Sequence, residues 1–152
     1  MLNEDYKDIL QLLADENVKF LLVGAYALAA HGYPRATMDI DLWIMPSLDN
    51  AEAVLRALQR FGAPLEELTI ADLQKDDTVF QIGVAPRRID LITGVSGLQF
   101  KKAFAHSIEI DIEGIKIHIL SVEDLIQNKI ATGRIKDLAD VEVLKKLTLD
   151  EG

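Results

Sequence analysis

Residues 38–45 form the segment that most restricts how this chain can fold. Apolar side chains alternate with acidic or aromatic ones, which is the two-residue period of a β-strand. One set of positions holds Ile40, Leu42 and Ile44, and the other holds Asp39, Asp41 and Trp43. Aspartate is disfavoured inside strands, and two aspartates on one face repel each other. We therefore expect one face to pack in a core and the other to require a cation or a basic group.

The flanking segments predict helices and further strands around this one. Apolar residues at helical spacing, or a run of helix formers in the case of residues 25–30, predict helices over residues 2–16, 25–30, 48–61, 121–133 and 136–147. Ser47 or Asp49 would cap the third of these helices and Gly62 would end it. Short apolar runs predict strands over residues 19–23, 79–84, 88–93, 108–112 and 115–119, the last two joined by a Glu113-Gly114 turn. This order predicts an α+β or mixed α/β domain, with helices packed on one small mixed sheet.

Composition and charge narrow the class of protein. The chain has 152 residues, of which 49% are hydrophobic and none is cysteine. These values suit one domain over residues 1–152 and exclude disulfides and thiolate metal sites. The net charge of −9 opposes binding to long nucleic acids. The N-terminus carries acids in place of a basic targeting stretch, and the apolar run 20–30 is too short to cross a bilayer. We therefore expect a cytoplasmic protein without a membrane contact.

The paired aspartates are suited to binding a divalent cation. Carboxylates two residues apart on a strand project side by side, and Mg²⁺ prefers such oxygen ligands. A third acid, Asp90, lies in the apolar run 88–93 and would join the pair if its strand lies beside the first. Three carboxylates can hold two metal ions for phosphoryl transfer, with Asp90 as bridging ligand or base. A solvent-exposed Asp-x-Asp on an edge strand is the alternative that this triplet alone leaves open.

Two further features have both a functional and a structural interpretation. Gly24 and Ala25 lie where a strand passes into a helix, and small residues there let backbone N–H groups approach a phosphate. The same turn also occurs for steric reasons alone. Trp43 shares the face of the acids, so it would either stack near a substrate or pack beneath a neighbouring helix.

The order of these motifs resembles that of the DNA polymerase beta-like nucleotidyltransferase superfamily. Its recurring pattern is an apolar strand, Gly-Gly or Gly-Ser, a short helix, and then Asp-x-Asp or Asp-x-Glu. The matching residues here are Gly24 and Ala25, Asp39 and Asp41, and the later Asp90. The spacing Arg-x-Thr-x-Asp-x-Asp, which begins at Arg35, is most similar to that of small stand-alone bacterial nucleotidyltransferases and the AbiEii-type toxin group. The resemblance covers residues 19–144.

This resemblance implies a nucleotidyltransferase fold and a set of residue roles. Mg²⁺ or Mn²⁺ would be held by the catalytic residues Asp39, Asp41 and Asp90. The phosphates of a nucleoside triphosphate would lie near Gly24, Ala25, Arg35, Thr37 and Lys129. Ala25 replaces the second Gly or the Ser of the pattern, so a hydroxyl is absent while the backbone N–H remains. The group also carries Asp-x-x-Asp after the lysine, here Asp137 and Asp140, although these acids could equally form surface pairs with Arg134.

The leading hypothesis is a metal-dependent enzyme that transfers a nucleoside monophosphate from a triphosphate to a hydroxyl. The acceptor would be a small molecule, a tRNA or a partner protein. An alternative is a catalytically inert, antitoxin-like module of the same fold, which Ala25 favours and the three retained acids oppose. A phosphohydrolase lacks support because His31, His106 and His118 are scattered along the chain.

Overall fold

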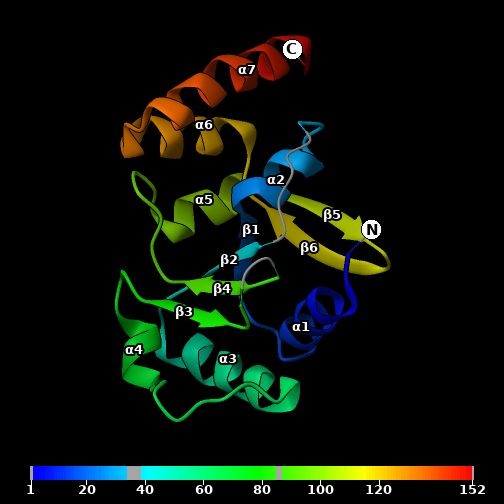
Figure 1. Ribbon diagram of the computed structural model, residues 1–152, viewed down its shortest axis with the longest axis vertical. Helices are drawn as coiled ribbons and strands as arrows, with labels where there is room; N and C mark the ends of the chain where they lie inside the picture. The colour runs from blue at the N-terminus through cyan, green and yellow to red at the C-terminus, as the bar shows by residue number, and fades with distance from the viewer. Residues whose placement is uncertain (1, 34–38, 85–86, 152) are drawn as a thin grey trace.

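The computed structural model describes residues 2–33, 39–84 and 87–151, with side chains up to residue 146. Figure 1 shows helices on both sides of a twisted sheet, which confirms the mixed α/β class predicted from the sequence. In chain order the elements are α1 (Glu4–Asp15), β1 (Phe20–Val23), α2 (Gly24–Ala30), β2 (Ile40–Ile44), α3 (Leu48–Phe61), α4 (Ile70–Gln74), β3 (Val79–Ile82), β4 (Ile89–Ile92), α5 (Phe100–His106), β5 (Ile108–Ile112), β6 (Ile115–Ile119), α6 (Val122–Thr132) and α7 (Ile135–Glu151).

Within the described residues the strands form a six-stranded mixed sheet in the order β3-β4-β2-β1-β6-β5. Strand β2 is antiparallel to β1 and parallel to β4, while β1 is parallel to β6. Strands β5 and β6 form the predicted hairpin, and its turn residues Glu113 and Gly114 have φ values of 50° and 89°. Positive φ at both positions is typical of two-residue turns that join antiparallel strands.

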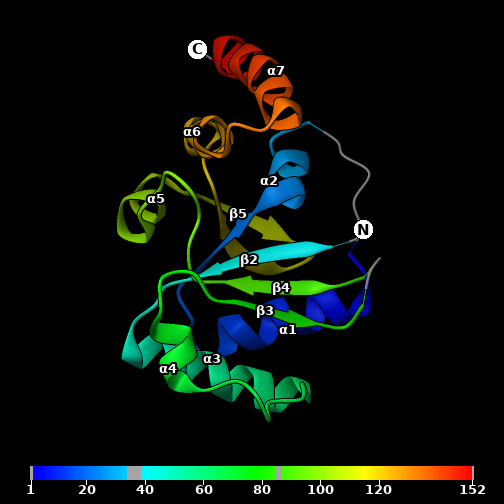
Figure 2. The same ribbon diagram turned by 60° about the vertical axis from the view of Figure 1, so that its left-hand side comes forward.

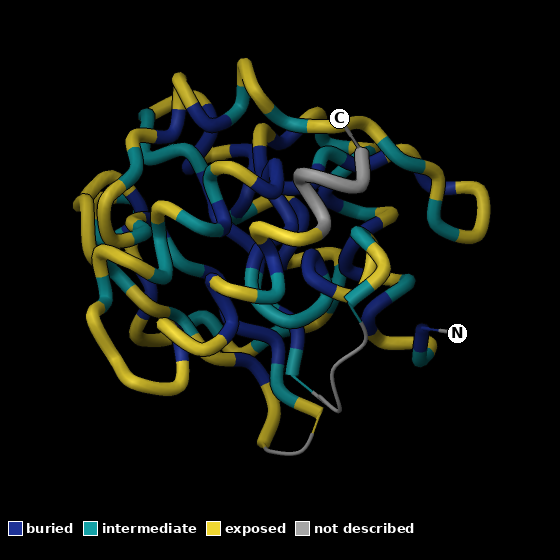
Figure 3. Tube along the Cα trace, turned by 90° about the horizontal axis from the view of Figure 1, so that it is seen from above, coloured by how far each residue is buried: buried dark blue, intermediate teal, exposed yellow. Residues whose placement is uncertain are grey.

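The sheet separates two helical layers (Figures 1 and 2). Helices α1, α3 and α4 lie on one side, and α2, α5, α6 and α7 lie on the other. Ile40, Leu42 and Ile44 pack in the core of the first layer, whereas Trp43 packs in the core of the second. The predicted alternation of β2 is therefore confirmed. Viewed from above, buried segments run through the middle of the molecule and exposed turns surround them (Figure 3).

The helix ends follow their capping residues. The Ser47 side chain accepts from the backbone N–H of Asn50, and α3 ends at Gly62 in the left-handed conformation. Ser121 and Gly133 cap α6 in the same way. These boundaries agree with the sequence, while α7 begins at residue 135 and continues to residue 151 rather than spanning 136–147.

Two short helices, α4 and α5, are not among the elements predicted from the sequence. Helix α4 starts with a reciprocal capping box, in which Thr69 and Asp72 each bond the other's backbone N–H. Helix α5 buries Phe100 and Ala103 in the second core. Five and seven residues carry too little apolar periodicity to identify a helix, and neither segment has the run of alanines by which α2, also seven residues long, was predicted. In the described ranges no helix has the length and apolar character that crossing a membrane requires.

Asn50 is a buried polar residue that joins α3 to the ends of β1 and β2. Its Oδ1 accepts from the Lys19 backbone N–H at 2.7 Å. Its Nδ2 donates to the carbonyls of Lys19 and Met45 at 3.0 and 2.9 Å. These bonds satisfy backbone groups where the strands end, so α3 keeps a fixed position against the sheet.

We expect Asn50→Ala to lower the free energy of unfolding by about 1–3 kcal/mol, because it removes three hydrogen bonds and takes away the partner of the Lys19 N–H. Urea denaturation followed by circular dichroism measures the change. The exposed Gln59, on the same helix, provides the control, since Gln59→Ala should change the value by less than about 0.5 kcal/mol. A loss below about 1 kcal/mol for Asn50→Ala would contradict this role.

Candidate active site

Strands β2 and β4 bring the predicted acidic residues together. The two strands are parallel neighbours, and their register pairs Asp41 directly with Asp90. Neighbouring strands lie about 4.8 Å apart, so the two carboxyls stand side by side on one face. Asp90 is only 8% exposed. The strand pairing on which the predicted cluster depended is therefore present, and Asp39 precedes β2 at the same edge of the sheet.

Arg88 supplies the positive charge that this face requires. Its Nε lies 2.7 Å from Asp90 Oδ1 and its Nη2 lies 3.1 Å from Asp90 Oδ2, a bidentate pair. The same Nη2 lies 3.5 Å from Asp39 Oδ2, and the Arg88 backbone N–H donates to Asp39 Oδ1 at 3.0 Å. These acids hold the pKa of Arg88 above its usual value, through the Asp90 bond first. The guanidinium therefore bridges Asp39 and Asp90.

Sequence reasoning missed this role of Arg88, although the sequence contains a signal for it. Arg88 and Asp90 are two residues apart at the start of a strand, so their side chains share a face. The backbone of Arg88 is also fixed, because its carbonyl accepts from the Tyr6 hydroxyl at 3.2 Å and from the Ile40 N–H at 3.0 Å. An arginine two positions before a strand aspartate is thus a candidate partner for that acid.

Asp41 lies between Asp90 of β4 and Gly24 at the end of β1. Burial is the main cause that raises its pKa to about 6, and the adjacent Asp90 carboxyl raises it further. Arg88 acts in the opposite direction but does not cancel these effects. A carboxylate that is hard to ionise next to a second acid is typical of a site that receives an additional cation.

Gly24 packs directly against Asp41. Its φ is +67°, and a Cβ built there would collide with Asp41 Oδ2. Glycine is therefore required both by the backbone conformation and by the close approach of the carboxylate. Ala25 follows in the first turn of α2. Arg35 and Thr37, predicted to bind phosphates, lie outside the described residues.

Lys129 belongs to a buried network between α6 and α7. Its Nζ lies 3.3 Å from Asp137 Oδ1 and 3.0 Å from Asp140 Oδ2. Thr132 and Arg134 donate to Asp137 Oδ2, each at 2.7 Å. Burial alone would raise the pKa of Asp137, but these hydrogen bonds and the charge of Lys129 lower it. The pair of Arg134 with Asp137 that the sequence left open is therefore present, although Asp137 and Asp140 are both buried and not on the surface.

The Lys129 network also reaches the segment that leads to the acidic strand. Tyr33 follows α2, and its hydroxyl donates to Asp140 Oδ1 at 3.4 Å. This bond connects the C-terminal helices to the chain shortly before Asp39. The described residues do not show Lys129 in contact with the three acids on the sheet, so its predicted contact with a triphosphate stays a prediction.

Among the described side chains no three His, Cys, Asp or Glu groups are arranged to hold one metal ion. Asp39 and Asp90 instead direct oxygens toward Arg88. The oxygen donors nevertheless suit a hard divalent cation, which prefers carboxylate ligands. The Arg88 guanidinium already places a positive charge between these carboxylates.

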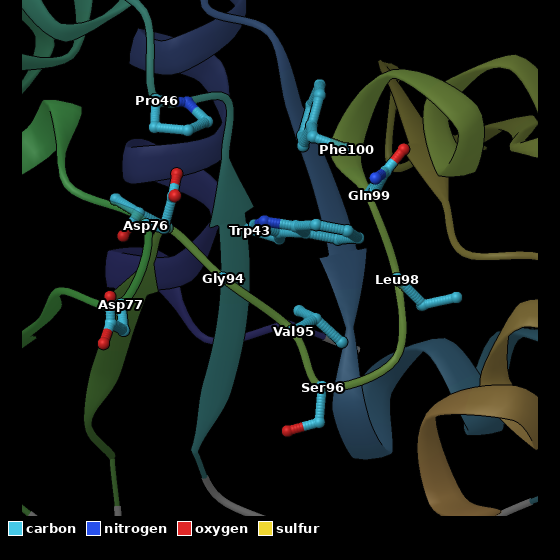
Figure 4. Close-up of a pocket in the computed structure, with 11 residues that line it drawn as sticks. Trp43, Pro46, Asp76, Asp77, Gly94, Val95, Ser96, Leu98, Gln99 and Phe100 are labelled. Carbon is cyan, nitrogen blue, oxygen red and sulfur yellow. The ribbon is translucent and has the colours of Figure 1, made fainter. Parts of the chain in front are cut away.

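A pocket of about 590 Å³ opens near the end of β2 (Figure 4). Trp43 forms part of its wall and packs edge-on against Phe100 of α5, with ring centroids 5.2 Å apart. Asp76 and Asp77 lie on the opposite side of the pocket, and the loop after β4 passes between (Figure 4). Trp43 therefore packs beneath a helix, as one of its two interpretations required, and also borders a cavity.

We expect Asp41→Asn to stabilise the fold at pH 7.5 and to have little effect at pH 4. The folded-state pKa of Asp41, about 6, exceeds its ordinary value of 3.8, so the stabilising form is protonated. That contribution is complete below about pH 3.8 and is lost as the pH rises through 6. Asparagine does not ionise, so the variant does not lose this stabilisation. A pKa shift of this size corresponds to about 2–3 kcal/mol in the free energy of unfolding.

Urea denaturation of both proteins at each pH measures this difference. Asp8→Asn, an exposed substitution of the same kind on α1, is the control and should change stability by less than about 0.5 kcal/mol. Equal stability of the Asp41→Asn variant and the unmodified chain at pH 7.5 would show that ionisation of Asp41 does not lower the free energy of unfolding.

Comparison with known proteins identifies the family of this chain. The family model described as "Nucleotidyltransferase of unknown function (DUF6036)" matches residues 2–148. No curated protein matches the chain. Among solved structures, a Thermotoga maritima protein assigned as a nucleotidyltransferase has a TM-score of 0.60 at 17% identity, over 100% of this chain and 97% of its own.

A second solved structure, the antibiotic-resistance factor ANT(2'')-Ia, has a TM-score of 0.61 at 15% identity, over 97% of this chain and 83% of its own. At these identities the two structures establish the shared fold. Together with the match of the family model over nearly the whole length, they support the superfamily inferred from the motifs. The chain belongs to the DUF6036 family of nucleotidyltransferases of unknown function.

Proposed function

We propose that this protein transfers a nucleoside monophosphate from a nucleoside triphosphate to a hydroxyl acceptor with the help of Mg²⁺ or Mn²⁺. The observation that carries the proposal is the register of β2 and β4, which sets Asp41 against Asp90. Gly24 lies against the same carboxylate, so a backbone turn suited to phosphate and a pair of acids meet at one point. Asp39, Asp41 and Asp90 are the proposed catalytic residues and metal ligands.

The reaction forms one bond and breaks one. The acceptor oxygen bonds to the α-phosphorus, the bond from that phosphorus to the α,β-bridging oxygen breaks, and pyrophosphate leaves. Asp90 accepts the proton of the acceptor hydroxyl. To do so, its carboxylate must first separate from the Arg88 guanidinium. Bound metal ions supply neutralisation of the triphosphate charge and a lower pKa of the attacking hydroxyl. Burial and the Asp90 carboxyl oppose ionisation of Asp41 in the free protein, so an added positive charge would stabilise its ionised form.

The proposed phosphate contacts come from three parts of the chain. Gly24 lies against Asp41, and its backbone N–H and that of Ala25 are the first proposed contacts. Arg35 and Thr37 stay predicted contacts. Lys129 would have to leave at least one of the two carboxylates that hold its Nζ, since both pairs are buried.

The nature of the acceptor is part of this proposal. ANT(2'')-Ia is named as an antibiotic-resistance factor with substrate-regulated conformation dynamics, and a likeness to it favours a small-molecule acceptor. The other acceptors considered are a tRNA and a partner protein, and the net charge of −9 opposes binding of the tRNA.

Membership of the AbiEii-type toxin group, a bacterial source and a cytoplasmic location stay predictions from the sequence.

The first test is transfer of label from each α-labelled nucleoside triphosphate in Mg²⁺ or Mn²⁺ to a cell extract of RNA, protein and metabolites. We expect pyrophosphate release together with a labelled fraction that identifies the acceptor class. The Asp39→Ala/Asp41→Ala variant should lose at least about 99% of the transfer, because both proposed ligands are gone. Absence of transfer and of metal-dependent nucleotide binding would leave the inert, contact-acting module that Ala25 favours.

A second test concerns the release of Asp90 by Arg88. We expect Arg88→Ala to bind Mn²⁺ without nucleotide on the order of tenfold more tightly, because a competing cation has been removed. Electron paramagnetic resonance of free Mn²⁺ measures this affinity. Arg87→Ala removes the same charge from the neighbouring exposed residue and should have a smaller effect. Weaker or unchanged Mn²⁺ binding by Arg88→Ala would contradict the competition.

A further inference from the structure

We propose that this chain forms a symmetric dimer, in which strand β3 of one copy pairs antiparallel with β3 of a second copy. Within the described residues β3 is the last strand at one end of the sheet, and β4 is its one neighbour. Figures 1 and 2 show β3 as the outermost strand beside β4. Such an edge presents backbone donors and acceptors to any strand that reaches it. This pairing does not depend on the proposed nucleotide transfer.

The hydrogen-bond alternation of the β3–β4 pair shows which backbone groups face outward. The Thr93 N–H donates to the Thr78 carbonyl at 3.1 Å, so these residues form a hydrogen-bonded pair at the start of β3. In antiparallel strands the bonds to one neighbour recur at every second residue. The residues between those positions, Val79 and Gln81, therefore direct their N–H and carbonyl groups to the outer edge. Both residues are exposed.

The two edges of the sheet differ in how they are protected. Strand β5, at the other edge, carries the exposed acids Glu109 and Asp111. Charged side chains on an edge oppose its pairing with another chain. By contrast, residues 78–84 include no charged residue and no proline. Val79 and Val84 are 59% and 80% exposed. The edge at β3 is therefore the one suited to pairing.

The charges at the two ends of β3 favour a second copy as the partner. Asp76 and Asp77 precede the strand and are exposed, while Lys75 is paired with Asp72 at 3.6 Å. Arg87, also exposed, lies in the turn that follows the strand. The edge is thus negative at its start and positive at its end. When two such edges run antiparallel, each acidic end meets the basic end of the other copy, because a two-fold axis relates the two contacts.

This pairing sets two candidate sites on one face of a continuous sheet. Gln81 lies opposite Asp90 in the register of β3 and β4, so their side chains share a face. Residues opposite each other across the two copies of β3 share that face as well. Three strand spacings, about 14 Å, then separate Asp90 from the same residue of the second copy. The second copy therefore borders the open side of the candidate site.

Sedimentation equilibrium of the full-length chain from about 1 to 200 µM tests the proposal. We expect a monomer–dimer equilibrium with a Kd on the order of 10 µM, as for a small interface. Gln81→Pro removes an outward N–H and should keep the chain monomeric, since proline is tolerated where that group faces away from the sheet. Gln81→Ala keeps the N–H and should dimerise like the unmodified chain. A monomer at about 200 µM would overturn the proposal.

Charge exchange tests the identity of the partner and the direction of the strands. Asp76→Lys/Asp77→Lys and Arg87→Glu each place like charges together at both ends, so each variant alone should dimerise at least about tenfold more weakly. An equimolar mixture of the two should recover the original affinity, because both ends are complementary again. Glu66→Lys/Glu67→Lys makes the same change at another exposed acidic pair and should leave the affinity within about twofold. A mixture without recovery would contradict the antiparallel pairing.

Cross-linking locates the interface. The chain has no cysteine, so one introduced cysteine reports which edge is near the second copy. Neighbours across two paired strands lie about 5–8 Å apart. We expect a short bismaleimide to link two copies of the Gln81→Cys variant and to leave the Glu109→Cys variant, on the β5 edge, unlinked. Preferential linking of Glu109→Cys would place the interface at β5 and overturn the proposal.

Discussion

Mutual repulsion among Asp39, Asp41 and Asp90 is the constraint on which the candidate site depends. The apolar residues between these acids are buried beneath α1 and α3, so the carboxylates cannot turn to another face without exposing the core. Burial raises the pKa of Asp41 to about 6, and Asp90 stands directly beside it. Such an arrangement persists only with a counter-charge, and in this fold Arg88 provides it at 2.7 Å.

The counter-charge from Arg88 is well suited to be temporary. The Arg88 and Asp39 side chains are each 30% exposed, so water can replace their contact when the guanidinium moves. The backbone of Arg88 is held by Tyr6 and Ile40 and need not move with it. One residue can thus keep the acids together in the free protein and leave room when a stronger cation arrives, and the fold itself need not change.

The residues that stabilise the fold and the residues of the candidate site lie mostly on different sides of the sheet. On one side, Asn50 and the larger apolar core fix α3 and the strand ends. On the other side, the aromatic core around Trp43, the Gly24 turn and the acids share the surface with a pocket. Helices α6 and α7 are joined by the buried Lys129 network, whose bond from Tyr33 to Asp140 ties them to the segment before β2. The C-terminal helices are therefore positioned relative to the site by polar contacts as well as by packing.

Much of the fold follows from local patterns in the sequence. The alternation in β2, the Ser47 and Ser121 caps, the glycines that end α3 and α6, and the Glu113-Gly114 turn each depend on neighbouring residues alone. The short helices α4 and α5 escaped prediction because fewer than two turns carry too little periodicity, and their stability comes from a capping box and from burial of Phe100. The acids themselves were also recognisable, because aspartate within an apolar strand is unfavourable without a partner.

The alternating strand, the acids on its polar face and the need for a positive group beside them follow from local sequence alone. Which group supplies that charge depends on the fold, because only the parallel pairing of β2 with β4 brings Arg88 and Asp90 next to Asp39 and Asp41. The fold also buries Lys129 together with Asp137 and Asp140, and it sets Asp76 against the end of β4 near Trp43. Side-chain periodicity is set by adjacent residues, whereas charge pairing and burial depend on segments distant in the chain, so local patterns do not reveal them.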